Sequence, residues 1–449
     1  MKNKKLIVIG GDAAGMTAAS KVRREQPERE IIVFERGNHT SYSACGIPYY
    51  IGGQVESEEH LIARKPEVFS QKQNIDVRIR HEVIDIELDK KRIKVKSQDP
   101  QKEYWEAWDD LLIATGASPI VPKIENIDAN GIFALSTLQS GINVFKFMKL
   151  KKPAKAVIIG GGYIGIEMAE AFLNRSMDVT LIDMAPQLIK TFDKDMAHIV
   201  YEYMEDTQMK VLLEQKLQKF ETKSDGSVKS VITDKQTIPA DIVILGMGVK
   251  PNSEIASRAG INLGANNAIS VNKRLETSAP NVWAAGDCAE SFHLISKKQV
   301  HIALGTIANK HGLVAGINIS GGNTEFPGVA GTAITKFKDL QLSRTGLSEK
   351  EAKELKIDYL TETITSFSSA HYYPGSEKIH VKLVVDKKTM RILGGQIIGL
   401  KDSAKRIDTI ATAITAGFTV QQMMDLDLAY APPFSNVWDP VQIAARKLV

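Results

Sequence analysis

The chain of 449 residues contains only two cysteines, Cys45 and Cys288, and they lie far apart in the sequence. Two thiols are too few for a disulfide-stapled secreted scaffold or a cysteine-ligated iron–sulfur cluster. Their separation also excludes a CxxC or CxxxxC redox pair. Thiol chemistry in this protein must therefore use one cysteine together with an oxidised partner from outside the chain.

Cys45 is the stronger candidate for this chemistry. It lies in the segment SYSACGIPYYIGG, residues 41–53, where the Gly-Ile-Pro after the cysteine indicates that a short helix begins. Because a helix N-terminus favours negative charge, we expect the pKa of Cys45 to be lowered and its thiolate to be nucleophilic. The alternative is a buried structural thiol, which is the commoner state of a free cysteine. Cys288 lies in a turn that follows a strand, and we expect it to be a bystander.

An internal repeat provides the elements that must position this thiol. Residues 6–35 and 156–183 each contain an apolar strand, a glycine-rich turn, a helix with small residues on one face, and a second apolar strand that ends in an acid. This unit binds a dinucleotide by placing its phosphates at the helix N-terminus. Two copies in one chain predict two dinucleotide-binding domains.

The second copy carries the complete G-x-G-x-x-G pattern at Gly160, Gly162 and Gly165, and Asp183 follows its second strand. An acid at this position accepts hydrogen bonds from the ribose hydroxyls and repels a 2′-phosphate. No arginine follows directly in residues 184–186, so the sequence predicts a preference for NADH over NADPH.

The first copy departs from the pattern. Gly10, Gly11 and Gly15 are present, but Asp12 stands where the second glycine belongs, and the unit ends at Glu35. The strand–turn–helix context still predicts a nucleotide site, with a plain βαβ turn as the alternative.

Two further segments indicate a flavin. Residues 277–289 end a strand with Gly286 and Asp287, and we expect a helix to follow, with the Asp287 carboxylate accepting from a ribityl hydroxyl. Residues 109–117 form a strand that ends in Thr115 and Gly116, as at a crossover between an FAD and an NAD domain. In this order the segments predict that the first copy binds FAD and the second NAD.

Composition excludes several classes of protein. Lys and Arg number 57 against 53 Asp and Glu, and a net charge of +4 does not indicate a nucleic-acid or membrane partner. The apolar run LIVIG near the N-terminus is too short for a signal peptide, and no stretch approaches the roughly 20 residues of a membrane-spanning helix. We therefore expect a cytoplasmic protein. The nine histidines form no HxxH or HExxH spacing, so no metal site is expected.

These patterns predict an α/β fold with two Rossmann-like dinucleotide-binding domains and a C-terminal α+β domain. We expect residues 1–117 and 249–326 to form the two parts of an FAD-binding domain, and 118–248 an NAD(P)H-binding domain. Residues 327–449 alternate in strand fashion and then give an amphipathic helix over 404–416. Residues 321–323, Gly-Gly-Asn, are the expected linker.

The chain resembles the flavoprotein disulfide reductase (pyridine nucleotide–disulfide oxidoreductase) family over essentially its whole length. The resemblance rests on GGDAAG, ATG, GGGYIG and AAGD, at residues 10–15, 114–116, 160–165 and 284–287. Members with two active-site cysteines carry a CxxxxC pair, whereas the lone cysteine here resembles the single-cysteine branch. That branch contains coenzyme A disulfide reductases, NADH oxidases, NADH peroxidases and persulfide or polysulfide reductases.

The resemblance implies FAD and NADH as cofactors, with NADPH possible, and coenzyme A as substrate or bound thiol. The cofactor-binding residues that it implies, together with those named above, are Gly10, Gly11, Ala14, Gly15, Glu35, Arg36, Ser43, Thr115, Gly116, Gly160, Gly162, Ile164, Gly165, Asp183, Gly286 and Asp287.

Within the branch, the segments HYYPG, residues 371–375, and LAYAPPFS, residues 428–435, resemble those of the coenzyme A disulfide reductases. The resemblance implies that Tyr372, with Tyr373 as its alternative, and Tyr430 reach Cys45 of the partner subunit in a homodimer. There they assist proton delivery or stabilise the departing thiolate. An interface tyrosine is the other interpretation. The implied coenzyme A pocket contains Thr17, Lys21, Arg24, Ser41, Lys72 and Asn309, although basic residues on one helix face can equally be a solvated surface.

Three functions remain open from the sequence. The first is reduction of coenzyme A disulfide or persulfide through a mixed disulfide on Cys45, with a polysulfide reductase as a close variant that lacks the cue of an appended rhodanese-like domain. The second is an NADH oxidase or peroxidase that uses a Cys45 sulfenic acid. Ala44 stands where some coenzyme A disulfide reductases have an asparagine, and its small side chain leaves room for a sulfur-chain substrate or for oxygen chemistry. The third, a flavin-storing or redox-sensing protein, does not explain a complete NAD half.

Overall fold

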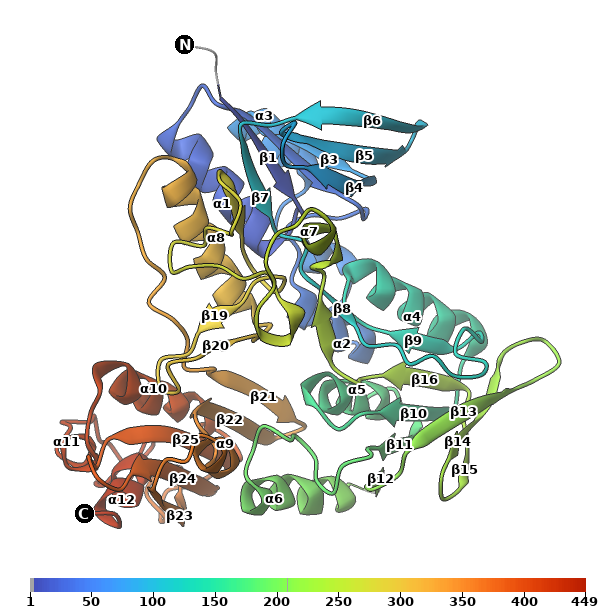
Figure 1. Cartoon of the computed structure of the whole chain (residues 1–449). Coiled ribbons are helices and arrows are strands. Elements are labelled where there is room, and N and C mark those ends of the chain that lie inside the picture. Colours follow the sequence, from blue (N-terminus) through green and yellow to red (C-terminus); the bar gives the residue numbers. More distant parts are fainter. Residues whose placement is uncertain (1–3, 208) are drawn as a thin grey trace.

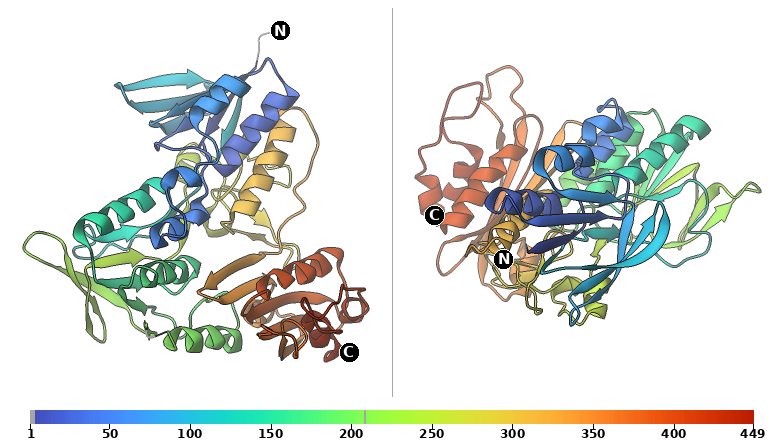
Figure 2. Two further views of the ribbon diagram at one scale, coloured as in Figure 1. Left: turned by 180° about the vertical axis from the view of Figure 1, so that it is seen from behind. Right: turned by 90° about the horizontal axis from the view of Figure 1, so that it is seen from above.

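The computed structural model describes residues 4–207 and 209–449. Three lobes surround a central region (Figure 1). The N-terminal segment and helix α8 (Gly305–Ile319) share the upper lobe, residues of about 120–250 form a second lobe, and the C-terminal residues form the third. The view from behind shows the same three-lobed outline (Figure 2). The α/β class predicted from the sequence is confirmed.

The first lobe contains a parallel five-stranded sheet with the strand order β18-β7-β1-β2-β3. Its central strand reads KLIVI and is buried after its first residue, as a strand covered on both faces requires. The bounds of its elements are β1 (Lys5–Ile9), α1 (Ala13–Glu25), β2 (Glu30–Glu35), η1 (Ala44–Gly46), α2 (Ile47–Gly52), η2 (Glu58–Leu61), α3 (Pro66–Gln73), β3 (Asp76–Ile79), β7 (Asp110–Ile113), α7 (Glu254–Arg258), η3 (Ala265–Asn267), β18 (Val282–Ala284), β19 (Ser291–Phe292) and β20 (Gln299–Val300).

The second lobe repeats this architecture with the parallel order β12-β11-β10-β16-β9. Its elements are β9 (Ile132–Ala134), α4 (Leu138–Lys151), β10 (Lys155–Ile159), α5 (Tyr163–Leu173), β11 (Asp178–Ile182), α6 (Lys194–Glu205), β12 (Lys210–Leu212) and β16 (Ile242–Leu245). The predicted pair of βαβ units is therefore confirmed.

The duplication extends beyond the βαβ units. Each lobe inserts a three-stranded antiparallel sheet before the strand that returns to the parallel sheet. These sheets are β4 (His81–Glu87), β5 (Arg92–Gln98) and β6 (Gln101–Ala107) in the first lobe, and β13 (Leu217–Thr222), β14 (Val228–Thr233) and β15 (Thr237–Pro239) in the second. Strands β8 (Ala117–Pro119) and β17 (Val249–Pro251) pair where the chain crosses between the lobes.

The third lobe is an antiparallel sheet with the order β21-β22-β25-β24-β23, covered by short helices. The predicted helix over 404–416 is present as a 3₁₀ turn followed by α10, which ends at Gly417 in the left-handed conformation that favours glycine. The bounds are β21 (Ala333–Phe337), β22 (Leu340–Gly346), α9 (Glu349–Glu354), β23 (Tyr359–Phe367), β24 (Lys378–Asp386), β25 (Ile392–Gly399), η4 (Ala404–Arg406), α10 (Ile407–Ala416), α11 (Val420–Met424) and α12 (Pro440–Arg446).

A buried ion cluster fastens the second lobe to the third. Lys382 on β24 is only 3% exposed, and its ammonium lies 2.7 Å from Asp195 and 3.6 Å from Asp193, beside α6. Glu349 on α9 pairs with the same ammonium. Because an unpaired buried charge is costly, these contacts oppose separation of the two lobes.

Candidate functional site

The glycine turns of the two copies have the same backbone geometry. Gly10 has a φ of +107° and Gly160 one of +111°, values that only glycine adopts readily. A Cβ at Gly10 would also lie 2.1 Å from the Ala114 carbonyl oxygen, and one at Gly160 would lie 2.3 Å from that of Gly246. At both positions the neighbouring strand leaves no room for a side chain.

The copies differ one step further along the turn. A Cβ added at Gly162 would meet nothing within 4 Å. The backbone that directly precedes α5 therefore faces open space there. In the first copy Asp12 stands at this place, and its carboxylate accepts a hydrogen bond from the Tyr42 amide at 3.1 Å. Burial raises the pKa of Asp12 to about 7, with further contributions from the charges of Glu35 and Asp287.

The acid at the end of the second strand is held in the same way in both copies. Glu35 accepts from the amides of Gly11 at 2.9 Å and Gly37 at 2.7 Å. Asp183 accepts from the amides of Gly161 and Ala185, each at 2.8 Å. Each carboxylate is therefore fixed beside its glycine turn, where a nucleotide ribose would lie in this type of fold.

Cys45 lies where the two copies meet. It is the middle residue of η1 and precedes α2, as the sequence predicted. Helix α2 packs against α5 of the second copy; the Arg175 guanidinium donates to the Ile51 carbonyl at 2.9 Å, and a Cβ at Gly52 would approach Ala171 Cα within 3.1 Å. The first copy thus supplies the thiol, and the second supplies the helix behind it.

The predicted lowering of the Cys45 pKa is wrong for the protein chain itself. The cysteine is exposed to solvent on one side, but protein surrounds the sulfur on the others, and this burial raises its pKa. The negative charges of Glu167, Asp287 and Asp12 raise it further. These carboxylates come from distant parts of the sequence, and together with burial they outweigh the backbone hydrogen bond at Cys45, which lowers the pKa.

Glu167 is a site residue that the sequence predictions missed. It lies on α5, two residues after the last glycine of the turn, and accepts from the Thr335 hydroxyl at 2.8 Å. Burial raises its pKa, and neighbouring Glu170 adds to the effect. An acid just after a Gly-rich motif, at the start of a helix, was the signal available in the sequence.

The flavin segment differs from its prediction in one element. No helix directly follows Asp287 among the described residues; a turn and the β19–β20 hairpin come first, and α8 begins only at Gly305. The Asp287 carbonyl accepts from His301 at 2.8 Å, and burial raises the pKa of the Asp287 carboxyl group. The hairpin leads directly to this histidine, so it takes the place of the helix beside the acid.

Cys288 and the crossover segment lie as the sequence suggested. Cys288 is fully buried, with its sulfur 3.4 Å from the Ile113 and Ala285 carbonyl oxygens. Gly116 has a φ of +67°, and a Cβ added there would meet nothing within 4 Å. The Thr115 hydroxyl donates to the Asn252 carbonyl at 2.6 Å.

Two residues of the implied coenzyme A pocket touch each other. The Thr17 hydroxyl on α1 donates to the Asn309 side-chain oxygen on α8 at 3.1 Å. Lys21 follows one turn later on α1 and pairs with Glu25. Arg24 and Lys72 are exposed, on α1 and α3, and these two helices are joined where Arg23 donates to the Asn74 carbonyl at 2.6 Å. Ser41 has a φ of +51° and donates its amide to the Gly11 carbonyl at 3.0 Å.

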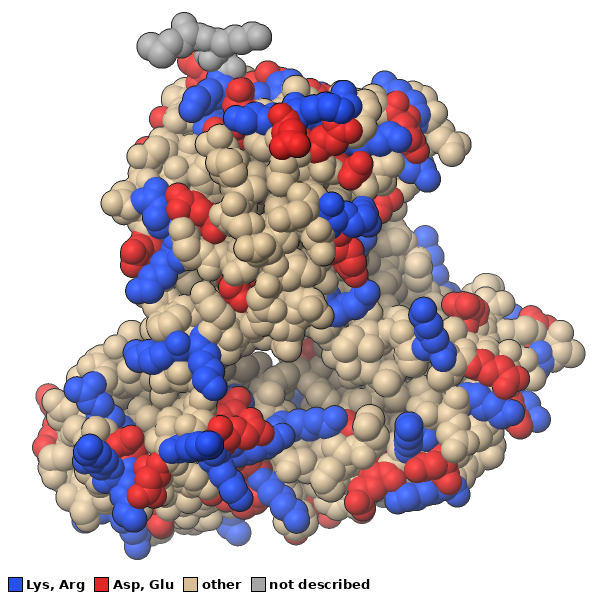
Figure 3. Space-filling model, viewed as in Figure 1, with Lys and Arg blue, Asp and Glu red and all other residues tan. Residues whose placement is uncertain are grey.

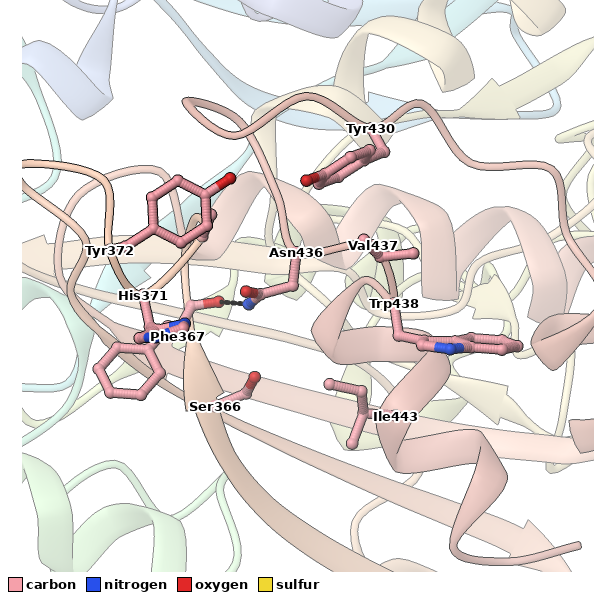
Figure 4. Close-up of a pocket in the computed structure, with 10 residues that line it drawn as sticks. Ser366, Phe367, His371, Tyr372, Tyr430, Asn436, Val437, Trp438 and Ile443 are labelled. Atoms are coloured by element: carbon pink, nitrogen blue, oxygen red, sulfur yellow. Dashed lines mark hydrogen bonds between the residues drawn. The ribbon is translucent and has the colours of Figure 1, made fainter.

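Tyr372 and Tyr430 share one hollow of about 490 Å³ in the third lobe. Their rings point toward each other across it (Figure 4), and a hydrogen bond with Tyr372 raises the pKa of Tyr430. Other residues that line the hollow include Phe367, Val437 and Trp438, which are 41%, 69% and 42% exposed. The structure brings the two tyrosines together but does not join either of them to Cys45 of the same chain through any contact among the described residues.

The remaining cofactor-binding residues that the family resemblance implies differ in their exposure to solvent. Ala14 is buried under the first turn of α1, and Ile164 is half-buried in the first turn of α5. Arg36 and Ser43 are exposed, after β2 and before η1.

Within residues 4–207 and 209–449, no group of His, Cys, Asp and Glu could hold a metal ion, and no helix is long and apolar enough to cross a membrane. On the face shown in Figure 3, acidic and basic side chains are interspersed.

The chain belongs to the pyridine nucleotide-disulphide oxidoreductase family. The family model matches residues 4–312, and the model of the family's dimerisation domain matches residues 332–441. The family is FAD- and NAD(P)H-dependent, and this protein is accordingly an oxidoreductase.

Relatives with more specific names match along the whole chain. An NAD(P)H sulfur oxidoreductase (CoA-dependent) of Pyrococcus furiosus is 43% identical over 449 residues, which cover all of both chains. A coenzyme A disulfide reductase of Staphylococcus aureus is 29% identical and covers 99% of each chain.

Solved structures agree with this assignment. The reduced CoADR-RHD of Bacillus anthracis superimposes with a TM-score of 0.96 at 36% identity, over all of this chain and 80% of that one. An NAD-dependent persulfide reductase of A. fulgidus gives 0.95 at 38% identity, over 99% and 82%. An engineered water-forming NADPH oxidase, bound to NADPH and derived from a Lactobacillus brevis enzyme, gives 0.94 at 27% identity, over 99% and 98%.

The residues present fit the two cofactors of the family. The Thr40 hydroxyl is buried beside Gly11 and Glu35 and has no hydrogen-bond partner in the described chain, as expected where a polar ligand completes the site. In the second copy the open backbone at Gly162 and the fixed carboxylate of Asp183 suit a pyrophosphate and a ribose.

Proposed function

We propose that this enzyme uses NAD(P)H to reduce coenzyme A disulfide or coenzyme A persulfide through a mixed disulfide on Cys45. The observation that carries the proposal is the position of Cys45, a lone and solvent-accessible thiol between two dinucleotide-binding copies. The names of the P. furiosus and S. aureus relatives support coenzyme A as the thiol carrier.

The chemistry needs only one protein sulfur. The Cys45 thiolate attacks a sulfur of coenzyme A disulfide, forms a Cys45–coenzyme A disulfide, and releases one coenzyme A thiolate that takes up a proton. FAD, when bound, takes two electrons from NAD(P)H and delivers them to this disulfide. Cleavage of the Cys45–coenzyme A disulfide releases the second coenzyme A and returns Cys45 as a thiolate. One NAD(P)H and one proton therefore convert one coenzyme A disulfide into two thiols.

The residues near the implied coenzyme A pocket support this substrate. Thr17 and Asn309 meet between α1 and α8, and Lys21 follows one helical turn later. The exposed Arg24 and Lys72 lie on α1 and α3, two helices that the contact of Arg23 with Asn74 joins. Ammonium and guanidinium groups are suited to the phosphates of coenzyme A. Their number is consistent with a ligand that carries several negative charges.

We propose a homodimer in which the third lobe of one subunit completes the site of the other. Tyr372 and Tyr430 sit on an exposed, partly apolar surface that a partner subunit would cover. The contact with Tyr372 raises the pKa of Tyr430, so the Tyr430 hydroxyl keeps its proton, as a proton donor to a departing thiolate requires. Since its thiols must stay reduced, we place the enzyme in the cytoplasm.

Oxygen reduction is the second candidate. The similarity to a water-forming oxidase favours it, and the small Ala44 beside Cys45 leaves room for oxygen chemistry as well as for a sulfur-chain substrate. In that reaction Cys45 would cycle through a sulfenic acid in place of a mixed disulfide.

The coenzyme preference also has support from a comparison. The engineered NADPH oxidase carries a replaced glycine, a replaced aspartate eighteen residues later, and introduced arginines one and seven residues after that aspartate. The same spacing from Gly165 leads in this chain to Asp183, Met184 and Lys190. Lys190 thus already places a cation seven residues after the aspartate, at the position of the second introduced arginine. This supports the use of NADPH as well as NADH.

Mass spectrometry of Cys45 after turnover tests the proposed function. The enzyme is incubated anaerobically with coenzyme A disulfide, without reductant, and the Cys45 peptide is analysed with and without later addition of NADH. We expect a coenzyme A adduct that NADH removes. A peptide that gains only oxygen, and only in air, would favour the oxidase.

A further inference from the structure

We infer that Lys190 is the residue that binds the 2′-phosphate of NADPH, and that this lysine together with Asp183 lets one site accept both coenzymes. The inference rests on the proposed use of NAD(P)H and assigns its specificity to a named pair of side chains. The preference for NADH predicted from the sequence depends only on residues 184–186 after Asp183 and therefore leaves Lys190 out.

The first step is the position of the ammonium. Lys190 Nζ lies 3.8 Å from Asp183 Oδ1. Among the described residues, it is the only cation within 4.0 Å of this carboxylate. The Asp183 side chain is about one-tenth exposed and that of Lys190 is 60% exposed. The carboxylate is therefore mostly buried and held by backbone amides, and the lysine side chain lies mostly exposed beside it.

The second step is the backbone that brings Lys190 there. The preceding residue, Ile189, has a φ of +42°, which is a genuine outlier for a β-branched side chain. Its amide donates to the Gly161 carbonyl at 2.8 Å, so the loop after Asp183 folds back onto the glycine turn. Leu188 Cδ2 packs against Gly161, 2.5 Å from where a Cβ would be, and closes the same loop. Strained backbone of this kind is held only when its surroundings fix it, and it directs Lys190 toward the ribose position.

The third step is the charge on Asp183. Both carboxylate oxygens already accept backbone amides, from Gly161 and Ala185. The carboxylate can still accept from ribose hydroxyls, which suits NADH. A 2′-phosphate would be repelled by an isolated carboxylate at this place, but an adjacent ammonium on a flexible stem can pair with the phosphate and offset that repulsion.

A plain surface ion pair is the alternative role for Lys190. Such pairs contribute little at an exposed position and would not discriminate between coenzymes. The two roles therefore differ in a binding measurement even if they do not differ in stability.

Isothermal titration of the oxidised holoenzyme with NADP⁺, NAD⁺ and 2′,5′-ADP tests the inference, with no sulfur acceptor present. We expect Lys190→Ala to weaken NADP⁺ and 2′,5′-ADP about tenfold, the scale of one partly screened charge-assisted hydrogen bond, and NAD⁺ less than about twofold. Lys190→Arg should keep or tighten NADP⁺ binding. Asp183→Ala should show the opposite pattern, with NAD⁺ weakened more than NADP⁺.

Three results would overturn the inference. The first is an equal loss for both coenzymes in Lys190→Ala, and the second is unchanged NADP⁺ affinity in that variant. The third is wild-type enzyme that does not bind NADP⁺ at all. Because no acceptor takes part, none of these results depends on whether coenzyme A disulfide is the substrate, and failure of the proposed function would leave the coenzyme affinities as predicted.

Discussion

The two dinucleotide-binding copies share a backbone but differ in the groups that they present to a ligand. Both have a left-handed glycine at the end of the first strand and a carboxylate held by two amides at the end of the second. The second copy then offers bare backbone at Gly162, whereas the first places the carboxyl group of Asp12 there. The shared features maintain the turn, and the differing residue adapts each copy to its own ligand and neighbours.

The segments that leave the two copies also differ. After its βαβ unit the first copy continues into the segment with Cys45, while the second continues into the loop with Lys190. The thiol therefore belongs to the copy for which we predict FAD, and the proposed coenzyme selectivity belongs to the other. Their contact through α2 and α5 brings the hydride donor's domain against the segment that carries the sulfur. A substitution in one copy should therefore remove the role of that copy and leave the role of the other copy intact.

Replacing the thiol should give the largest effect. We expect Cys45→Ser to lower turnover with coenzyme A disulfide at least about a thousandfold, because the hydroxyl cannot form the mixed disulfide. Reduction of the flavin by NADH depends on the other copy and should change less than about twofold. Rapid-mixing absorbance at the flavin band, with Cys288→Ser as the matched control, measures both. A comparable loss in the control would show that the roles of the cysteines had been misassigned.

The glycine turns provide the next test. Gly10→Ala and Gly160→Ala should each cost about 3 kcal/mol of stability, because both introduce backbone strain and a clash with a carbonyl oxygen. Gly162→Ala, in open space, should leave the free energy of unfolding within about 0.5 kcal/mol and weaken NADH binding instead. Urea unfolding and coenzyme titration separate the two. Equal destabilisation by all three variants would contradict the comparison.

Asp12 should make the first copy sensitive to pH. Its pKa of about 7 in the folded chain exceeds the ordinary 3.8, so the folded state binds this proton more tightly and stability falls as pH rises between about 4 and 7. Asp12→Asn keeps the acceptor for the Tyr42 amide and removes the titration. On going from about pH 5 to about pH 8, the free energy of unfolding of the variant should rise by about 2 kcal/mol relative to that of the wild type.

Denaturation at the two pH values checks the Asp12 prediction. A constant difference in stability between Asp12→Asn and wild type would contradict the assignment. The reciprocal variant, Gly162→Asp, places the same acid in the second copy and should weaken coenzyme binding there.

Replacing Glu167, which lies on α5 of the second copy, should give the smallest effect. The residue affected is Cys45 of the first copy, across the contact between the two copies. Burial is the main reason that the pKa of Cys45 is raised, and the Glu167 charge is the next. Glu167→Gln can still accept from Thr335 but carries no charge, so iodoacetamide should alkylate Cys45 faster at neutral pH, by a factor of about two. Slower alkylation would reverse the sign of this interaction.

Local patterns predicted much of this molecule. The glycine turns, the acids at Glu35 and Asp183 and the helix that begins after Cys45 follow from short stretches of sequence, and the structure contains all of them. The helix expected after Asp287 was wrong because a hairpin that leads to His301 occupies its place. A β-hairpin of two short strands leaves little hydrophobic periodicity to detect.

The failures at the site have a common cause. The Cys45 pKa depends on Glu167 and Asp287, which only the tertiary fold brings near the sulfur. Lys190 reaches Asp183 through a left-handed Ile189 that no propensity predicts. Long-range electrostatics and strained backbone are properties that short sequence patterns do not contain.

Flavin reoxidation in an anaerobic stopped-flow experiment tests the central claim most directly. Enzyme reduced with one equivalent of NADH is mixed with coenzyme A disulfide, and separately with coenzyme A persulfide, and the flavin absorbance is followed. The account predicts reoxidation with at least one of them that is far faster than without acceptor and that is lost in Cys45→Ser. Reoxidation no faster than in buffer alone, or equally fast in the variant, would contradict it.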